Sequence, residues 1–396
     1  MLLQFSVENF LSFRERASFD LTPGAGSELP ENIARNGKHQ ALKSAALFGA
    51  NASGKSNLIK AITAAVMIVR ESEAIPLGFP LWRIVPFKLD TTSRTKPSSF
   101  EFIFVADDVK YVYGFSADMK CITEEYLYAY YTLKPTTIFE RVLVDDKQVY
   151  SFKSDKKVLD ELAEKNTSNK LFLSTMAAWN YKRAKAPFLW FVNQIDTYNG
   201  SEWLQDFSAL NDEANESQKR FTIRLLEIAD INISDYQILA DGQSKDQGIY
   251  SVTTTHQVRE AGKKYNYFLG LEEESAGTQH IFIISKYLKK AFENGKTLIV
   301  DGLDAELHPL ILEKLIRMFH DSEINVTNAQ VIFTTHNSHL LDLDIFRRDQ
   351  IYFTEKSNET AASDLFSLDD FPVRKGESIR NGYLKGRYGA LPSILG

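Results

Sequence analysis

The chain has 396 residues, of which 44% are hydrophobic and 25% are charged, a composition that excludes disordered, collagen-like and coiled-coil proteins. Its 46 basic and 52 acidic residues give a net charge of −6, so any nucleic-acid contact would have to come from a local basic patch. The single cysteine, Cys121, excludes a disulfide framework. No signal-peptide pattern opens the sequence and no apolar run approaches the roughly 18 residues of a membrane span, which predicts a cytoplasmic protein without a membrane partner.

The first part of the chain is predicted to consist of strands followed by a helix. Alternating apolar residues predict a strand over 3–7 and a hairpin partner over 17–21, and residues 22–40 are expected to form a surface loop. The apolar run 44–48 predicts a buried strand, and the helical spacing of apolar residues predicts a helix that begins near residue 55. A strand, a glycine-rich turn and a helix in this order are the setting that a phosphate-binding loop requires.

That turn matches the P-loop pattern GxxxxGK[ST] at every fixed position over residues 49–56, GANASGKS. The two glycines allow backbone N–H groups to surround a phosphate, Lys55 is expected to reach the β- and γ-phosphates, and Ser56 is expected to ligate Mg²⁺. The sequence therefore predicts ATP and Mg²⁺ as cofactors. The residues of this loop expected to bind the nucleotide are Gly49, Asn51, Ala52, Ser53, Gly54, Lys55, Ser56 and Asn57.

The middle of the chain changes character twice. Alternating aromatic and β-branched residues over 86–131 predict an antiparallel meander with a turn at Asp107 and Asp108. Charged helical patterns predict a mostly helical insertion over 154–245. Strand patterns return at 248–255 and 265–271.

A second metal ligand is expected at Asp301. The residues TLIVD at 297–301 form an apolar run that is too short for a helix, and it ends in an acid at the carboxyl end of a predicted parallel strand. Such an acid alone is weak evidence, but a P-loop needs a carboxylate for its metal on a neighbouring strand. The predicted metal ligands are therefore Ser56 and Asp301.

Three motifs between residues 271 and 338 resemble those of ABC-type ATPase heads. LEEESAGTQH at 271–280 resembles the signature loop, LDAELHP at 303–309 the D-loop, and QVIFTTHNS at 330–338 the strand that carries the switch histidine, here His336. The resemblance implies that Ser275 and Gly277 cover a nucleotide held by a partner subunit, in a head-to-tail homodimer or a higher homo-oligomer. Without that resemblance, Ser275 would be an ordinary helix N-cap.

Gly302 departs from the pattern of this superfamily, which places a glutamate there as the catalytic base. Glycine has no group that could polarise water, so hydrolysis is expected to be slow or to depend on a partner. Glu306, Asp304 and His336 are the nearby candidates to replace it. The residues expected to act in catalysis are His336, Asp301 and Glu306.

Further segments resemble the AAA_15-type ATPases. They are FSVENFLSF at 5–13, SNLIKA at 56–61, Pro86 with Phe87, and GYLKGRYGA at 382–390. This resemblance implies an ATPase of bacterial phage-defence or abortive-infection systems that controls an RloB or other TOPRIM-type nuclease effector. The expected fold class is α/β, an ABC-type P-loop ATPase head with a mixed sheet flanked by helices, an antiparallel β subdomain and a mostly helical insertion. The expected domains are 1–153 and 246–396, which are the two halves of the head, and the insertion 154–245.

Other functions stay open at this point. An SMC- or RecF-like DNA-maintenance ATPase that binds DNA directly is the main alternative, although the chain lacks a long heptad arm. A scaffold that binds ATP only to assemble would also fit Gly302. The basic stretch 371–396, with five basic residues and one acidic residue, is either a solvated surface or a contact for nucleic acid or an acidic effector.

Overall fold

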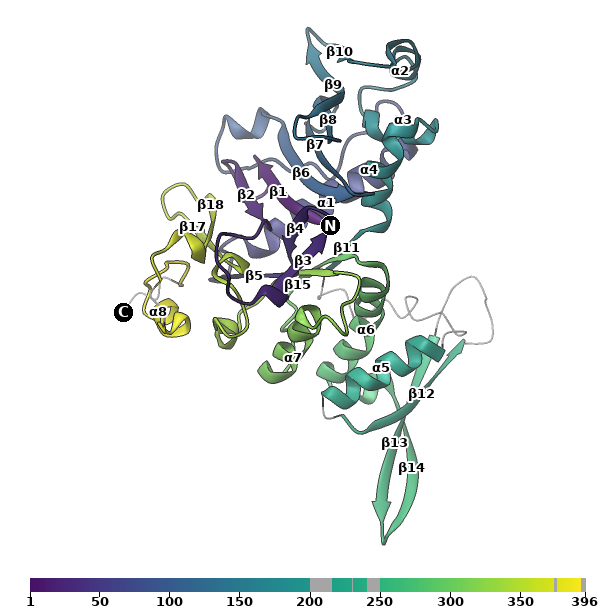
Figure 1. Cartoon of the computed structure of the whole chain (residues 1–396), viewed down its shortest axis with the longest axis vertical. Helices are drawn as coiled ribbons and strands as arrows, with labels where there is room; N and C mark the ends of the chain where they lie inside the picture. The colour runs from purple at the N-terminus through teal and green to yellow at the C-terminus, as the bar shows by residue number, and fades with distance from the viewer. Residues whose placement is uncertain (200–215, 230, 241–249, 374–375, 393–396) are drawn as a thin grey trace.

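Three tiers of secondary structure follow one another along the long axis of the computed structural model (Figure 1), which describes residues 1–199, 216–229, 231–240, 250–373 and 376–392. A seven-stranded antiparallel sheet lies at one end, a six-stranded sheet lies in the middle, and a three-stranded sheet lies at the other end. Helices pack on these sheets, so the fold is α/β as expected. Within the described residues, no helix combines the length and the apolar character that a membrane crossing needs.

The six-stranded sheet holds the predicted phosphate-binding strand at its centre, in the order β11-β15-β16-β5-β17-β18. All neighbours are parallel except β17 and β18. Its strands are β5 (Ser44–Gly49), β11 (Ile195–Asn199), β15 (Thr297–Asp301), β16 (Gln330–Thr334), β17 (Ile351–Lys356) and β18 (Ser363–Ser367). Because parallel strands end at the same edge of a sheet, this order brings the ends of β5, β16 and β15 together.

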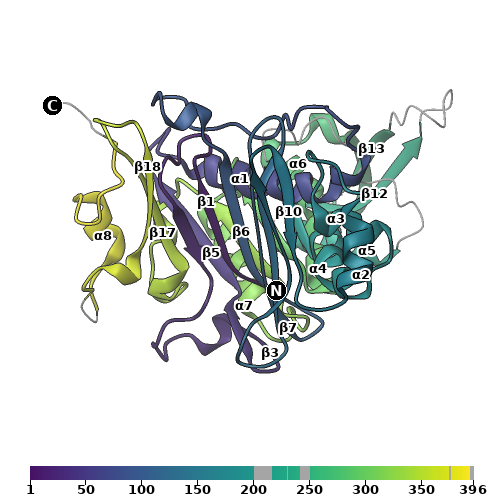
Figure 2. The ribbon, with the colours of Figure 1, turned by 90° about the horizontal axis from the view of Figure 1, so that it is seen from above.

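Helices cover both faces of this sheet (Figure 2). Strand β5 is buried throughout, and its residues alternate between two hydrophobic cores: Ala45 and Leu47 belong to one, Ala46 and Phe48 to the other. This two-sided burial explains why the run is continuously apolar. Helix α1 (Lys55–Glu71) contributes to the first core, and α6 (Ala276–Asn294), α7 (Pro309–His320) and α8 (Ile379–Leu384) contribute to the second.

The antiparallel sheet confirms the predicted N-terminal hairpin and meander. Asp107 and Asp108 have φ angles of 47° and 61°, the left-handed conformation of a tight two-residue hairpin turn. The meander continues by two strands beyond residue 131. The strands, in the order β10-β9-β8-β7-β6-β1-β2, are β1 (Leu2–Glu8), β2 (Ala17–Asp20), β6 (Ser98–Ala106), β7 (Val109–Ala117), β8 (Ile122–Tyr130), β9 (Thr136–Val144) and β10 (Lys147–Ser151).

The prediction of a plain surface loop over 22–40 is wrong. Strands β3 (Ile33–Asn36) and β4 (His39–Leu42) pair there as a small hairpin, with Gly37 at a φ of 56° in the turn. These strands have four residues each, and their apolar residues are adjacent, so they lack the alternation that marks a half-buried strand.

The described part of 154–245 is mostly helical, as predicted, but it contributes to all three tiers. Helices α2 (Lys156–Ala163), α3 (Phe172–Ala178) and α4 (Lys182–Asn193) pack beside the antiparallel sheet, and β11 then pairs in parallel with β15. Helix α5 (Glu216–Ile228) packs against α6. Residue 245 itself lies outside the described residues, and the boundaries of the three domains stay a prediction.

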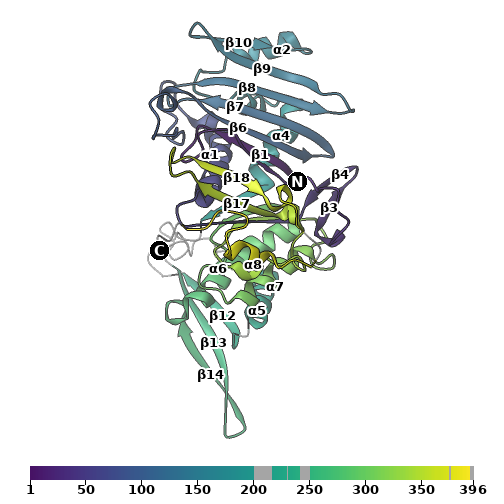
Figure 3. The same cartoon turned by 90° about the vertical axis from the view of Figure 1, so that its left-hand side faces the viewer.

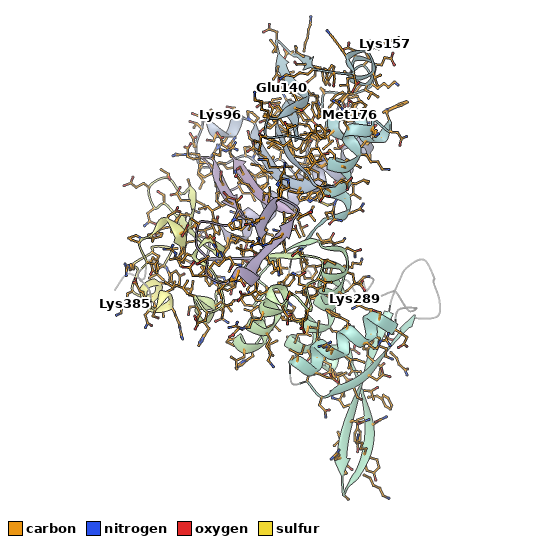
Figure 4. All side chains as sticks on the ribbon, viewed as in Figure 1. Lys96, Glu140, Lys157, Met176, Lys289 and Lys385 are labelled. Atoms are coloured by element: carbon orange, nitrogen blue, oxygen red, sulfur yellow. The ribbon has the colours of Figure 1, made fainter. Side chains whose placement is uncertain are left out.

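The three-stranded sheet projects from the far end of the molecule (Figure 3). Its strands β12 (Ile233–Ala240), β13 (Tyr250–Glu260) and β14 (Lys263–Gly270) pair antiparallel, and β14 is exposed along nearly its whole length. The strands expected at 248–255 and 265–271 are thus present, although residues 248 and 249 lie outside the described residues. Side chains of the β13–β14 hairpin extend into solvent on both sides (Figure 4).

A buried ion pair fastens helix α3 to the antiparallel sheet. Arg141 Nη1 lies 3.3 Å from Glu125 Oε2, and both side chains are fully buried. The carboxylate of Glu125 also accepts the backbone N–H groups of Phe172 and Leu173 at the start of α3, at 2.6 and 2.9 Å. Arg141 Nη1 donates to the carbonyl oxygen of Lys170 at 2.6 Å. Since no side chain of α3 caps its own N-terminus, Glu125 supplies the negative charge that this helix end favours.

We expect Arg141→Met to lower the free energy of unfolding by about 3 to 5 kcal/mol, because the change leaves the carboxylate of Glu125 buried without its charged partner. Arg16→Ala is the matched control: Arg16 forms an ion pair with Glu101 at 2.6 Å but is half exposed, so its loss should change stability by less than about 1 kcal/mol. Chemical denaturation followed by circular dichroism measures both variants. If the two variants are equally stable, the buried ion pair does not stabilise the fold more than the exposed pair does.

Candidate functional site

The loop between β5 and α1 has the backbone that its glycines require. Gly49 and Gly54 have φ angles of 151° and 122°. A Cβ atom on Gly49 would lie 2.4 Å from the carbonyl oxygen of Thr354, and one on Gly54 would lie 2.5 Å from Ser363 Oγ. Both positions therefore need glycine for space as well as for backbone conformation. Ser53 is buried and its hydroxyl lies 2.6 Å from Thr354 Oγ1, which ties the loop to β17.

The start of α1 is suited to an anion. Its N-cap residue is Gly54, no side chain caps the helix, and no acidic residue occurs in its first turn. The free N–H groups and the positive end of the helix dipole therefore point out of the helix start, where they can bind phosphate oxygens.

Lys55 lies folded against this loop. Its Nζ donates to the carbonyl oxygens of Gly49 and Ala50, both at 2.9 Å, and the residue is only 6% exposed. Burial lowers the pKa of Lys55 to about 8, although Asp301 and Asp304 oppose this by favouring the charged form. An ammonium held this way lies within the loop that would surround a phosphate.

Ser56 and Asp301 converge as predicted, and Thr334 joins them. Ser56 Oγ donates to Asp301 Oδ1 at 3.0 Å, and Thr334 Oγ1 donates to the same oxygen at 2.6 Å. Hydroxyl and carboxylate oxygens are the ligands that Mg²⁺ prefers, and Mg²⁺ is usually held by one or two protein groups together with phosphates and water. The two predicted ligands fit this ion. No cluster of three or more metal-ligating side chains occurs in the described ranges.

Gly302 lies directly beside this pair. Its N–H donates to Thr334 Oγ1 at 2.7 Å, and its φ angle is 71°, which glycine adopts without strain. A Cβ atom there would meet no heavy atom of the described chain within 4 Å. The backbone conformation thus favours glycine, while the space beside it would admit a longer side chain.

His336 follows β16, and Asp304 holds its backbone. Asp304 Oδ2 accepts the N–H of His336 and the hydroxyl of Thr335, both at 2.8 Å. Partial burial and the nearby Lys55 ammonium lower the pKa of His336, against the opposing effect of Asp304 and Asp301. The lowered pKa favours the neutral imidazole.

A cavity of about 840 Å³ opens beside the P-loop. Its walls come from residues 48–53, from His336 and Ser338, from β17 with the turn after it, and from the C-terminal segment around Tyr383 and Leu391. Asn51 and Ala52, predicted to contact the nucleotide, are exposed and line this cavity. Asn57 instead points to the N-terminal hairpin, where its amide donates to Ser12 Oγ at 2.8 Å.

The remaining predicted residues form a second group at the start of α6. Ser275 caps this helix, since its hydroxyl accepts the N–H of Thr278 at 3.2 Å. A Cβ atom on Gly277 would lie 2.7 Å from the carbonyl oxygen of Glu306, so close packing explains this glycine. Glu306 is exposed, with a φ angle of 58°. Neither these three residues nor Lys55, Ser56 and Asp301 occur among the described residues that line the P-loop cavity.

Sequence reasoning missed the hydroxyl groups that organise the site. Thr334 lies in β16 and Thr354 lies in β17, two strands of the same sheet. Thr334 contacts Asp301 and Thr354 contacts Ser53 of the P-loop, and both contacts join residues that are far apart in the sequence. The only sequence signal is a threonine at the end of an apolar strand, which is common in proteins that bind no nucleotide.

Solved structures with similarity to the chain include heads of SMC proteins. The SMC head domain from Thermotoga maritima has a TM-score of 0.43 and 14% identity, covering 94% of this chain and 99% of its own. The SmcHead bound to the C-winged helix domain of ScpA has a TM-score of 0.42 and 12% identity, with coverages of 92% and 97%. A head with an extended coiled coil from Pyrococcus furiosus has a TM-score of 0.39 and 13% identity, covering 92% of this chain and 96% of its own. The fold class rests on the sheet order and the motif positions described above.

Among curated proteins, none matched the sequence. Residues 44–342 match the family AAA_21, described as "AAA domain, putative AbiEii toxin, Type IV TA system". The match begins with β5 and extends past the switch-histidine strand, so it includes the P-loop, Asp301 and the start of α6. The predicted resemblance is thus confirmed at the level of an ATPase domain with a P-loop, although the matching family is AAA_21 and not the predicted AAA_15. Since more than half of the sequence is matched, the chain belongs to the AAA_21 family of ATPase domains.

Proposed function

We propose that the chain binds ATP with Mg²⁺ and acts as a nucleotide-gated homodimer that controls a partner effector in anti-phage defence. One observation carries the nucleotide-binding part of this proposal: Lys55, Ser56 and Asp301 converge at the uncapped start of α1. The N–H groups of the loop and the Lys55 ammonium bind the phosphates, and the oxygens of Ser56 and Asp301 hold the metal. When bound, Mg²⁺ neutralises charge on the phosphate oxygens.

Slow hydrolysis follows from the groups around Gly302. The carboxylate of Asp304 already accepts two hydrogen bonds that hold the backbone at His336, and Glu306 packs with the start of α6. The Asp304 carboxylate is thus engaged with the backbone, and the contact of Glu306 with α6 is made by its backbone carbonyl oxygen. Neutral His336 can accept or donate a hydrogen bond at the γ-phosphate end, so it serves as a sensor of the bound nucleotide.

A second copy of the chain completes the site. Ser275 and Gly277 lie at the start of a helix whose dipole favours an anion. In a head-to-tail pair, this helix start faces the nucleotide of the other protomer. The nucleotide then joins the two copies, and its hydrolysis separates them.

A protein effector is the partner that the charges favour. Arg387 forms an ion pair with Glu377, and its guanidinium also donates to the carbonyl oxygen of Pro372 at 3.2 Å, so this basic side chain serves the fold. Lys385 lies at the outer side of the molecule (Figure 4), and Arg374 and Lys375 lie outside the described residues. The toxin–antitoxin wording of the AAA_21 description supports a setting in which the partner is a toxic effector, for which we propose an RloB or other TOPRIM-type nuclease.

We expect Gly302→Glu to raise the rate of ATP hydrolysis at least about tenfold, the low side of a general-base contribution. Gly302→Ala is the control, because it imposes the same left-handed backbone, at a cost of about 1 to 2 kcal/mol, without adding a carboxylate. Phosphate release at saturating ATP and Mg²⁺ measures both variants. If the two variants hydrolyse ATP at the same rate, the missing glutamate does not limit turnover.

ATP with Mg²⁺ should convert the monomer into a dimer in light scattering coupled to size-exclusion chromatography. Ser275→Arg should abolish the dimer while nucleotide affinity stays within about twofold, because this residue contacts only the partner's nucleotide. Lys55→Ala should abolish both nucleotide binding and the dimer. A wild-type chain that binds ATP and stays monomeric would refute the sandwich.

Nucleotide affinity should fall as the pH rises above about 8. The phosphates bind the charged form of Lys55, and burial lowers the pKa of this ammonium to about 8 in the free protein. At pH 9 only about a tenth of the free protein carries the charge, so the affinity should drop by roughly tenfold between pH 7 and pH 9. Titration of a fluorescent ATP analogue over this range tests the expectation. Lys55→Arg, which stays charged, should give a flat profile.

A further inference from the structure

The C-terminal segment, residues 379–392, forms one wall of the cavity at the P-loop. It comprises α8 and the turn that follows, and it lies beside β17 at the end of the molecule away from α5 (Figure 2). Five of its residues line the cavity: Tyr383, Leu384, Ala390, Leu391 and Pro392. This segment contains the whole GYLKGRYGA motif, residues 382–390, to which the nucleotide motifs give no role.

Aromatic rings join this segment to the central sheet. Phe353 of β17 stacks on Tyr383 and Tyr388, with ring centroids 5.5 and 5.9 Å apart and interplanar angles of 19° and 17°. Phe48, next to the P-loop, meets Tyr383 edge-on at 6.5 Å. Such pairs add about 0.5 to 1.5 kcal/mol each beyond burial, so the segment is firmly packed on the two strands next to the cavity.

Two glycines let the segment approach closely. Gly389 has a φ angle of 65°, and a Cβ atom there would lie 2.9 Å from Glu355 Oε2. The next residue, Ala390, donates its N–H to Glu355 Oε1 at 3.2 Å. A Cβ atom on Gly382 would lie 2.9 Å from the ring of Tyr388. The motif therefore places its turn directly against the end of β17.

The same end of β17 holds the P-loop through the preceding residue. Thr354 lies opposite Gly49 in the parallel register of β17 and β5, and its carbonyl oxygen would be 2.4 Å from a Cβ atom on Gly49. Its hydroxyl lies 2.6 Å from Ser53 Oγ. Thr354 thus contacts the P-loop while Glu355, the next residue, contacts the C-terminal turn.

We propose that the segment 379–392 is a positioning element of the nucleotide site. It holds the end of β17 at the place where Thr354 sets the P-loop, and in return a bound nucleotide restrains the segment. The inference rests on the nucleotide binding proposed above. The GYLKGRYGA motif then has a role in nucleotide binding. The mobility of the C-terminal surface, where Lys385 lies, then depends on whether a nucleotide is bound.

Gly389→Ala tests this role against a matched control. The change adds a methyl group against Glu355 and imposes a left-handed backbone on alanine. Gly376→Ala imposes the same backbone, at a φ angle of 80°, but meets no heavy atom of the described chain within 4 Å and lies outside the segment. With a fluorescent ATP analogue and Mg²⁺, Gly389→Ala should bind at least fivefold more weakly, and Gly376→Ala should bind within twofold of the unchanged chain.

Hydrogen exchange measures whether nucleotide binding slows the exchange of backbone amides in the segment, an effect that a purely structural role would not produce. In the unchanged chain, peptides from 379–392 should exchange at least threefold more slowly when the ATP analogue and Mg²⁺ are bound, and Gly389→Ala should remove this difference. Exchange that is indifferent to the analogue, or a Gly389→Ala affinity equal to that of the control, would overturn this inference alone. An unchanged chain that binds no analogue would overturn the proposed function as well.

Discussion

The parallel pairing of β5, β16 and β15 is the constraint on which the site depends. Each strand delivers one group to the same edge of the sheet: the P-loop after β5, Thr334 at the end of β16 and Asp301 at the end of β15. Ser56 and Asp301 are 245 positions apart in the chain but meet within hydrogen-bond distance. A shift of one residue in either strand pairing would move Asp301 away from Ser56. The predicted metal site therefore requires this strand register.

The sequence predicted those parts of the fold and site that depend on local spacing. The P-loop, the α1 helix and the strand before Asp301 are contiguous patterns, and the structure has each of them at the predicted place. The β3–β4 hairpin was missed because its strands are short and lack alternating apolar residues. Thr334 and Thr354 were missed because their roles come from strand pairing, which brings together residues with no fixed separation in the sequence.

The glycine at position 302 has two possible explanations, one in catalysis and one in the backbone. Its position beside Asp301 suggests a lost catalytic glutamate, whereas its φ angle of 71° and its hydrogen bond to Thr334 give a reason for glycine in the backbone alone. The Asp304 carboxylate, engaged with the backbone at His336, is tied to the same turn. The turn after β15 therefore fixes the backbone at His336, which we propose as the sensor of the γ-phosphate.

The projecting hairpin of β13 and β14 leaves an open strand at the margin of a sheet. Its exposed rings, Tyr265, Tyr267 and Phe268, are 44%, 46% and 62% exposed, and such a strand is a template on which another chain can add. Lys263 and Lys264 lie on the same strand, where their like charges repel a second copy approaching edge to edge. Chemical neutralisation of these two amines would remove that repulsion and turn a projecting arm into a seed for fibrous self-association.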